Sequence, residues 1–107
     1  MLEELWRRYK LEGDIDAKEE LIMECLPVVR SLAQRFGIHT LPCCDEDDLV
    51  SAGIMGLLDA IEKYDPREKT GFKTYAKCRI RGAILDEIRN LKWESRSTLE
   101  KIRDLKK

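Results

Sequence analysis

Aromatic and basic side chains are interspersed along the stretch between residues 64 and 93. The aromatic residues are Tyr64, Phe72, Tyr75 and Trp93, and the basic residues are Arg67, Lys69, Lys73, Lys77, Arg79, Arg81, Arg89 and Lys92. Aromatic rings stack on unpaired bases for about 1–3 kcal/mol each, while Lys and Arg neutralise phosphates. A protein that reads closed duplex DNA needs Arg, Asn or Gln directed at base edges in the major groove. The pattern therefore predicts binding to single-stranded or opening DNA.

A purely structural role competes for the same side chains. In that interpretation the aromatic residues belong to the core and the basic residues only solvate a helix. We favour the core role for Phe72, whereas Tyr75 is consistent with either role. Lys73, Lys77 and Arg81 recur every four residues, so we expect them to lie along one face of a helix.

The sequence contains no recognisable catalytic pattern. It has one histidine, no phosphate-binding loop and no nucleophile elbow. Asp86 and Glu87 are adjacent acids, but ion pairs with neighbouring basic residues explain them better than acid–base catalysis. We therefore expect a protein that is not an enzyme.

Four cysteines, Cys25, Cys43, Cys44 and Cys78, form neither a clear disulfide set nor a clear metal site. No C-x-x-C spacing occurs, and the adjacent Cys43 and Cys44 are poorly placed to bind one ion. His39 is the one imidazole that could join them. We expect free thiols in the reducing cytoplasm, with no metal and no cofactor. A thiol or metal sensor at Cys43 and Cys44 is the weaker alternative.

The near-neutral charge of the chain conceals two halves of opposite sign. Of its 107 residues 38% are charged, and the formal net charge is -1. Residues 1–66 hold 7 basic and 15 acidic side chains, a net of -8, whereas residues 67–107 hold 13 basic and 6 acidic ones, a net of +7. Such asymmetry predicts two working faces with different partners. The N-terminus is acidic and no apolar run approaches the roughly 18 residues of a membrane span, so we expect a cytoplasmic protein without a membrane partner.

Hydrophobic spacing predicts helices throughout, so the expected fold class is all-α. The apolar fraction of 43% is sufficient for one small core, and we expect a compact bundle of about five helices. They begin with a short helix that Gly13 stops, continue on both sides of a break or kink at Pro27, and end with longer helices over 45–63 and 72–91. A loop is expected over 38–44. We assign residues 1–93 to the helical domain and residues 94–107 to a polar, partly helical tail.

Gly53 and Gly56 lie three residues apart inside a predicted helix, where each costs about 1 kcal/mol relative to alanine. This spacing predicts the close approach of another helix. The approaching helix belongs either to the same core or to a partner protein, and both interpretations stay open.

Two parts of the sequence together resemble one family. Residues 48–66, DLVSAGIMGLLDAIEKYDP, resemble the polymerase-binding segment of bacterial RNA polymerase sigma factors, the sigma-70 family. Residues 72–76, FKTYA, and 79–89, RIRGAILDEIR, resemble the segments that melt promoters and recognise the minus-ten element, and they look most like the flagellar and sporulation-type subgroup. The resemblance extends from about Leu5 to Trp93 and implies the helical second domain of these factors.

The resemblance also implies partners and site residues. In that family the acidic-headed helix docks on the clamp helices of the β′ subunit of core RNA polymerase, and the long helix binds the non-template strand of the minus-ten element. Carried over, the polymerase-facing residues are Asp48, Ser51, Ala52, Ile54, Met55 and Leu58. The DNA-facing residues are Tyr64, Lys73, Tyr75, Lys77, Cys78, Arg79, Gly82 and Leu85, and Arg81 joins them from the basic helix face. We expect Tyr75, Lys77 and Arg79 to share one groove.

Three departures from the family pattern bear on this interpretation. Cys78 and Arg79 stand where housekeeping members carry paired tryptophans, which the flagellar subgroup also lacks. The turn over 67–71 and the residues after Trp93 differ from the usual sequences. Segments that would read the minus-thirty-five element are absent, which leaves an isolated domain, a truncated gene product or a minimal factor.

The leading hypothesis is a sigma factor domain that binds core RNA polymerase, recognises the minus-ten element and helps to melt it during transcription initiation. In that case flipped, stacked bases supply specificity and phosphate contacts supply salt-sensitive affinity. The alternative is a sigma-like adaptor or decoy that occupies the polymerase clamp, or binds an anti-sigma factor, without initiating transcription.

Overall fold

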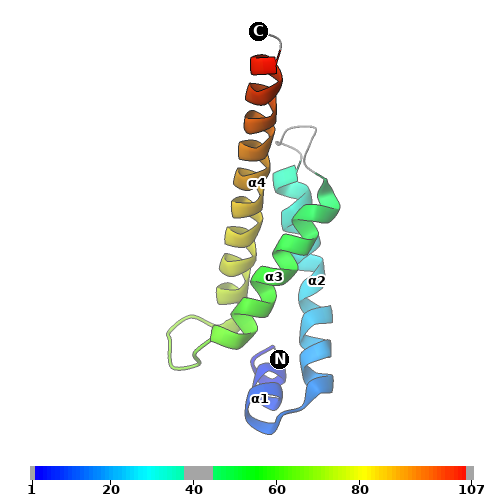
Figure 1. The fold of residues 1–107 in the computed structure, drawn as a ribbon. Helices are drawn as coiled ribbons and strands as arrows, with labels where there is room; N and C mark the ends of the chain where they lie inside the picture. Colours follow the sequence, from blue (N-terminus) through cyan, green and yellow to red (C-terminus); the bar gives the residue numbers. More distant parts are fainter. Residues whose placement is uncertain (1, 38–44, 106–107) are drawn as a thin grey trace.

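The computed structural model describes the backbone of residues 2–37 and 45–105, and the side chains of those ranges as far as residue 91. Four helices make up this part of the chain: α1 (Leu2–Glu12), α2 (Ile15–Gly37), α3 (Glu46–Lys63) and α4 (Phe72–Leu105) (Figure 1). No strand occurs in these ranges, and the predicted all-α fold is confirmed. The loop predicted over 38–44, with His39, Cys43 and Cys44, lies outside the described residues.

Helix α2 runs through Pro27, so the predicted break is wrong and the described ranges hold four helices instead of about five. Its buried side chains form one stripe on both sides of the proline: Ala17, Leu21, Cys25, Val29, Leu32 and Ala33. A proline removes the hydrogen bond to the carbonyl four residues earlier, here that of Met23. Met23 and Pro27 are both exposed residues, so they lie on the outer side of α2. Continuous packing on the inner side of α2 therefore outweighs one hydrogen bond lost on the outer side.

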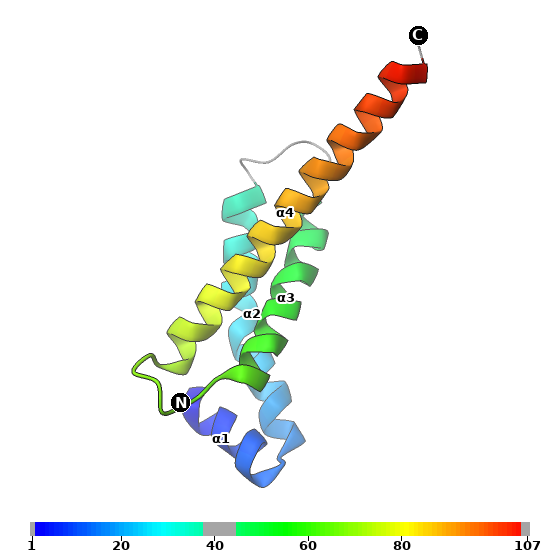
Figure 2. The same ribbon diagram turned by 60° about the vertical axis from the view of Figure 1, so that its left-hand side comes forward.

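The core lies where α3 crosses α4, with α2 packed against both (Figures 1 and 2). A Cβ atom on Gly56 would lie 2.7 Å from the carbonyl oxygen of Arg79 and 2.8 Å from the Cβ of Ala83. A Cβ atom on Gly53 would lie 2.7 Å from Cγ1 of Val29. Both glycines thus permit a close approach inside the chain, and the structure decides between the two interpretations in favour of internal packing.

Helix α1 lies against the end of α3 and the start of α4 (Figure 1). The indole Nε1–H of Trp6 donates to the carbonyl oxygen of Ile61 at 2.8 Å. A carboxylate oxygen of Glu3 accepts from the backbone N–H of Phe72 at 3.1 Å, which satisfies one of the unpaired donors in the first turn of α4. Gly13, with a φ of +69°, turns the chain from α1 into α2. The N-terminal helix therefore helps to fix where α4 begins.

Helix α4 continues to Leu105 and does not end near Leu91, where the hydrophobic stripe predicted its end. From Ala83 onward the sequence contains neither glycine nor proline, so nothing in it interrupts a helical backbone. The C-terminal part of α4 extends past the ends of α2 and α3 (Figure 2). The helix crosses residues 93 and 94, and a division of the chain there stays a prediction. No described helix combines the length and the apolar character that a membrane crossing requires.

Candidate functional site

The six residues that the resemblance assigns to polymerase binding share one accessible side of α3. They are the exposed Asp48, Ser51 and Met55 and the partly exposed Ala52, Ile54 and Leu58. At about 100° per residue they fall within an arc of about 160°. The other side of the helix holds the buried residues Leu49, Gly53, Gly56, Leu57, Ala60 and Ile61. We call the accessible side, defined by the first six residues, the α3 face.

The α3 face begins with negative charge. Asp45 caps the helix, because a side-chain oxygen accepts from the backbone N–H of Asp47 at 3.1 Å. Glu46, Asp47 and Asp48 occupy the first turn, where carboxylates face the positive end of the helix dipole. The predicted acidic start of this helix is confirmed. An acidic end followed by the exposed Met55 suits a protein partner with basic and apolar side chains.

Tyr75 and Arg79 project from the side of α4 that faces α3. The ring centroid of Tyr75 lies 5.7 Å from that of Tyr64. The guanidinium of Arg79 forms an ion pair with Asp59 of α3, and the Nζ of Lys63 lies 3.0 Å from the other carboxylate oxygen of Asp59. Hydrogen bonds from Lys63 and then from Arg79 hold the pKa of Asp59 below its usual value, so this carboxylate is charged at neutral pH. Arg79 is therefore already paired within the chain.

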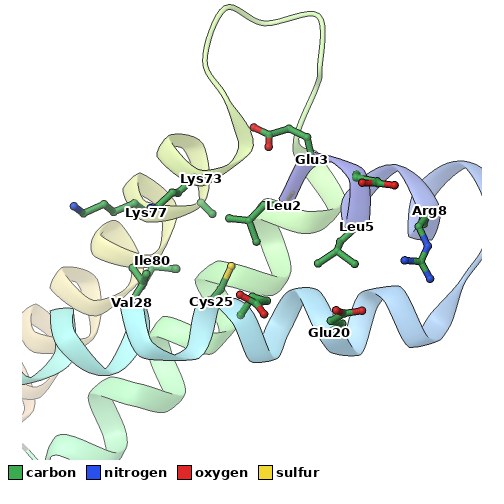
Figure 3. A pocket seen from close by; sticks show the side chains of 13 residues that line it. Leu2, Glu3, Leu5, Arg8, Glu20, Cys25, Val28, Lys73, Lys77 and Ile80 are labelled. Atoms are coloured by element: carbon green, nitrogen blue, oxygen red, sulfur yellow. The ribbon is translucent and has the colours of Figure 1, made fainter.

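Lys73, Lys77 and Arg81 project from the other side of α4, toward α1 and α2. Lys73 and Lys77 line a groove of about 800 Å³ between α1, α2 and α4. They stand at one end of this groove, and Arg8 stands at the other (Figure 3). The Cζ of Arg81 lies 5.8 Å from the ring centroid of Phe36, on α2. Positive charge therefore follows the side of α4 that borders α2.

The expectation that Tyr75, Lys77 and Arg79 share one groove is wrong. Two residues turn a helix by about 200°, so Lys77 points away from both Tyr75 and Arg79, which are four residues apart and share a side. The structure divides the DNA candidates between two edges of α4. We call Tyr75 with Arg79 the aromatic edge, and Lys73 with Lys77 and Arg81 the basic edge.

Cys78, Gly82 and Leu85 lie between the two edges, on the outward side of α4, and we call them the outer strip. Cys78 and Gly82 are exposed, and Leu85 is partly exposed. A Cβ atom on Gly82 would meet nothing within 4 Å, so packing within the described chain does not require a glycine there. A glycine inside a helix costs about 1 kcal/mol relative to alanine. Gly82 thus leaves the backbone of α4 open to an approaching partner at the expense of helix stability.

Tyr64 is buried, with 8% of its surface exposed, and it supports Tyr75 from beneath. Its ring makes edge contacts with Trp6 at 5.2 Å and with Phe72 at 5.3 Å. Its hydroxyl donates to the carbonyl oxygen of Thr70 at 3.2 Å. Phe72 is fully buried, as the core interpretation predicted, whereas Tyr75 is partly exposed. Within this aromatic cluster, Tyr75 is therefore the ring that a ligand can reach.

Sequence reasoning missed acidic residues that face the candidate cations. Asp59 pairs with Arg79, and Glu20 and Glu24 line the same groove as Lys73 and Lys77. Glu20 and Glu24 lie on α2, outside the two segments that carried the resemblance. Asp59 lies inside one of them but was assigned no role. The only signal in the sequence was its helical spacing from Met55, four residues earlier.

Two cysteines fall within the described side chains, and both are free thiols. Cys25 is buried, and burial raises the pKa of its thiol, so it is a packing residue and not a reactive thiolate. Cys78 is exposed on the outer strip. Within the described ranges, no three His, Cys, Asp or Glu side chains gather closely enough to hold a metal ion.

Comparison with known proteins identifies the family of the chain. The chain matches the family described as sigma-70 region 2 over residues 21–94. It is 40% identical over 97 residues to the RNA polymerase sigma-D factor of Bacillus subtilis strain 168, and 42% identical over 97 residues to the RNA polymerase sigma factor FliA of Escherichia coli strain K12. Both alignments cover 91% of this chain, but 38% and 40% of the respective relatives. The FliA sigma factor of Pseudomonas aeruginosa is 40% identical over 92 residues, which are 85% of this chain and 37% of that relative.

The chain thus spans about two fifths of the length of the curated relatives that it matches. The matched residues contain the α3 face, both edges of α4 and the outer strip. The resemblance deduced from the residues is confirmed. Because the family match covers more than half of the chain, this protein belongs to the sigma-70 family and carries its region 2.

Proposed function

We propose that this chain binds core RNA polymerase through the α3 face and promoter DNA through α4, and that it helps to hold the minus-ten element open during transcription initiation. The sigma factor family is non-enzymatic, which agrees with the prediction that the chain is not an enzyme. One observation carries the proposal: two exposed surfaces of different character lie on two helices that pack directly on each other. A sigma factor works where the polymerase works, so the proposal includes a cytoplasmic location.

The α3 face is the proposed polymerase surface. It joins an acidic first turn to the exposed side chain of Met55, so it offers a partner both charge and apolar area. The family resemblance suggests the clamp helices of the β′ subunit as that partner. The matched relatives are themselves named RNA polymerase sigma factors.

The outward side of α4 is the proposed DNA surface. A single strand that follows the outer strip would meet Tyr75 and Arg79 on one side and the basic edge on the other. Tyr75 is held from beneath by Tyr64, so its ring is in place to stack on an unpaired base. Lys73, Lys77 and Arg81 add positive charge for the phosphates. In this arrangement base contacts supply specificity and phosphate contacts supply position.

Two exposed methionines allow a matched test of polymerase binding. Met55, on the α3 face, is 66% exposed, and Met23, on α2, is 65% exposed. We expect Met55→Lys to weaken the capture of core polymerase by roughly tenfold, because it puts a positive charge opposite a partner surface that we expect to be basic and apolar. Met23→Lys should leave capture unchanged. Equal losses from both variants would exclude the α3 face as the docking surface.

Paired arginine variants test the DNA surface in the complex with core polymerase. Arg79→Ala combined with Arg81→Ala should weaken binding of a minus-ten single strand, and should flatten the slope of log affinity against log salt by about 1.4 for two lost phosphate contacts. The control combines Arg7→Ala with Arg30→Ala, which removes two exposed arginines of α1 and α2. An unchanged slope in the first double variant would remove Arg79 and Arg81 from the interface.

Run-off transcription separates initiation from the adaptor or decoy alternative. Core polymerase is supplied with a template that carries a minus-ten-like promoter, with and without this protein. RNA that forms only when the protein is present supports a role in initiation. Capture of the polymerase without RNA synthesis supports the adaptor or decoy.

A further inference from the structure

One side chain links the two proposed surfaces. Asp59, on α3, holds the guanidinium of Arg79, on α4, in an ion pair. The other carboxylate oxygen of Asp59 lies 3.0 Å from the Nζ of Lys63. Asp59 therefore has two cationic partners, one on its own helix and one on the helix proposed to meet DNA.

Asp59 belongs to the same side of α3 as the proposed polymerase contacts. It follows Met55 by four residues and Ala52 by seven, which are the spacings of neighbours along one helix face. Its side chain keeps 27% of its accessible surface despite the two ion pairs. A protein that covers Met55 would therefore reach Asp59.

We propose that Asp59 is a positioning residue that holds Arg79 against α3 in the chain alone, and that a cationic side chain of the polymerase takes over Asp59 on docking and releases Arg79 to a DNA phosphate. This inference rests on the proposed function. It makes DNA affinity depend on polymerase docking through one exchange of ion-pair partners. Neither the acidic residue nor its exchange belongs to the two candidate sets that the resemblance supplied.

The exchange requires little movement of the chain. The carbonyl oxygen of Arg79 is packed where a Cβ of Gly56 would lie only 2.7 Å away, so the backbone of α4 is fixed against α3. The side chain of Arg79 alone can rotate, and 47% of its surface is accessible. Exposed ion pairs are weak and screened by salt, so a phosphate can compete for the guanidinium. Asp59 keeps Lys63 as a partner after Arg79 leaves.

The first test uses the chain alone and a minus-ten-like single-stranded oligonucleotide, with affinity measured from about 50 to about 200 mM salt. Asp59→Asn frees Arg79, so binding should tighten roughly two- to fivefold, the strength of one exposed ion pair. The slope of log affinity against log salt should steepen by about 0.7, because one more phosphate is contacted. Asp59→Ala, which suits a helix, provides an independent variant with the same expected result.

Two further variants show whether the gain comes through Arg79. Glu62→Gln makes the same change of charge on the same helix, but it releases Lys10 and Lys18 of α1 and α2. Its slope should match that of the unmodified chain. Adding Arg79→Ala to Asp59→Asn should abolish the steeper slope, although Arg79→Ala alone changes it little. An unchanged slope in Asp59→Asn, an equal gain in Glu62→Gln, or a gain that survives Arg79→Ala would each overturn the inference.

The complex with core polymerase distinguishes this inference from the proposed function. If docking releases Arg79, the unmodified protein and Asp59→Asn should show equal slopes once both are bound to polymerase. Unequal slopes in the complex would overturn the inference and leave the proposed function standing. Failure of the unmodified protein to bind polymerase would overturn both.

Discussion

Replacing Gly56 with alanine adds one methyl group where α3 and α4 are closest. The new Cβ would lie 2.7 Å from the carbonyl oxygen of Arg79 and 2.8 Å from the Cβ of Ala83, distances that real Cβ atoms essentially never show. The oxygen belongs to the backbone of a helix, so it cannot swing aside as the tip of a side chain can. The two helices must move apart, and the packing of Leu57 and Ile80 between them is loosened.

The size of the effect follows from two opposing contributions. Alanine is favoured over glycine in a helix interior by about 1 kcal/mol. Overpacking a core costs about 1–3 kcal/mol, and the displacement of two backbones puts Gly56→Ala near the upper end of that range. The expected net loss in the free energy of unfolding is about 1–2 kcal/mol. In a domain of this size it lowers the Tm by about 4–16 °C.

Gly82→Ala is the matched control. It makes the same chemical change on a neighbouring helix, but the new Cβ would meet nothing within 4 Å. The gain in helix propensity is therefore retained, and we expect Gly82→Ala to stabilise the fold by about 0.5–1 kcal/mol. The same variant should bind a minus-ten strand more weakly if DNA approaches the outer strip. Higher stability with lower affinity would separate a partner role of Gly82 from a structural one.

Thermal and urea unfolding, followed by far-ultraviolet circular dichroism, measures both variants against the unmodified chain. The difference in free energy between Gly56→Ala and Gly82→Ala isolates the steric cost, because the propensity gain is common to both. A Gly56→Ala variant as stable as Gly82→Ala would refute the close approach of α3 and α4.

Three further predictions concern the aromatic cluster and α1. Trp6→Phe removes the hydrogen bond to the carbonyl oxygen of Ile61 and should lower the free energy of unfolding by about 1–2 kcal/mol in urea titrations. Trp6→Tyr keeps a polar group at the tip of the side chain, but it should not restore the lost free energy of unfolding. Hydrogen bonds from Lys10 and then from Tyr9 hold the pKa of Glu62 below its usual value. The contribution of Glu62 to folding stability is therefore complete above its unfolded pKa and is lost as the pH falls through its folded pKa. Plots of Tm against pH for the unmodified chain and for Glu62→Gln should converge below about pH 4. Replacing Tyr75 by Ala should weaken binding of a minus-ten strand by about 1–3 kcal/mol in anisotropy titrations, whereas Phe at this position should retain most of it; equal losses would argue against stacking.

The sequence of α3 shows which features neighbouring residues can predict and which they cannot. The run of four acids from Asp45 to Asp48 predicted the start of a helix, and α3 begins at Glu46. The structure adds that Asp45 caps this helix by accepting a hydrogen bond from the backbone N–H of Asp47. The spacing of Gly53 and Gly56 predicted that another helix approaches closely. It did not reveal which helix, because the atoms that would collide with a Cβ belong to α2 and α4.

Pro27 shows the limit of a local rule. Proline removes one hydrogen bond and favours a break, but side chains of α2 on both sides of Pro27 reach the same core. The cost of the proline is local, whereas the burial of the stripe involves α3 and α4. The lost hydrogen bond can be read from the sequence, but the burial of the stripe can be weighed against it only in the folded structure.

By itself, the sequence determined the helical class, the acidic start of α3 and the separation of acidic from basic halves. Each of these depends on residues near one another in the chain, through helix periodicity, capping and composition. Tertiary structure decided which neighbour each edge of α4 faces and which candidate cations are already paired. Lys77 faces α2, and Arg79 is held by Asp59, because an edge of a helix acquires its environment from neighbours distant in sequence. Helix periodicity places a side chain around its own axis; the packing of the other helices decides what that side chain meets.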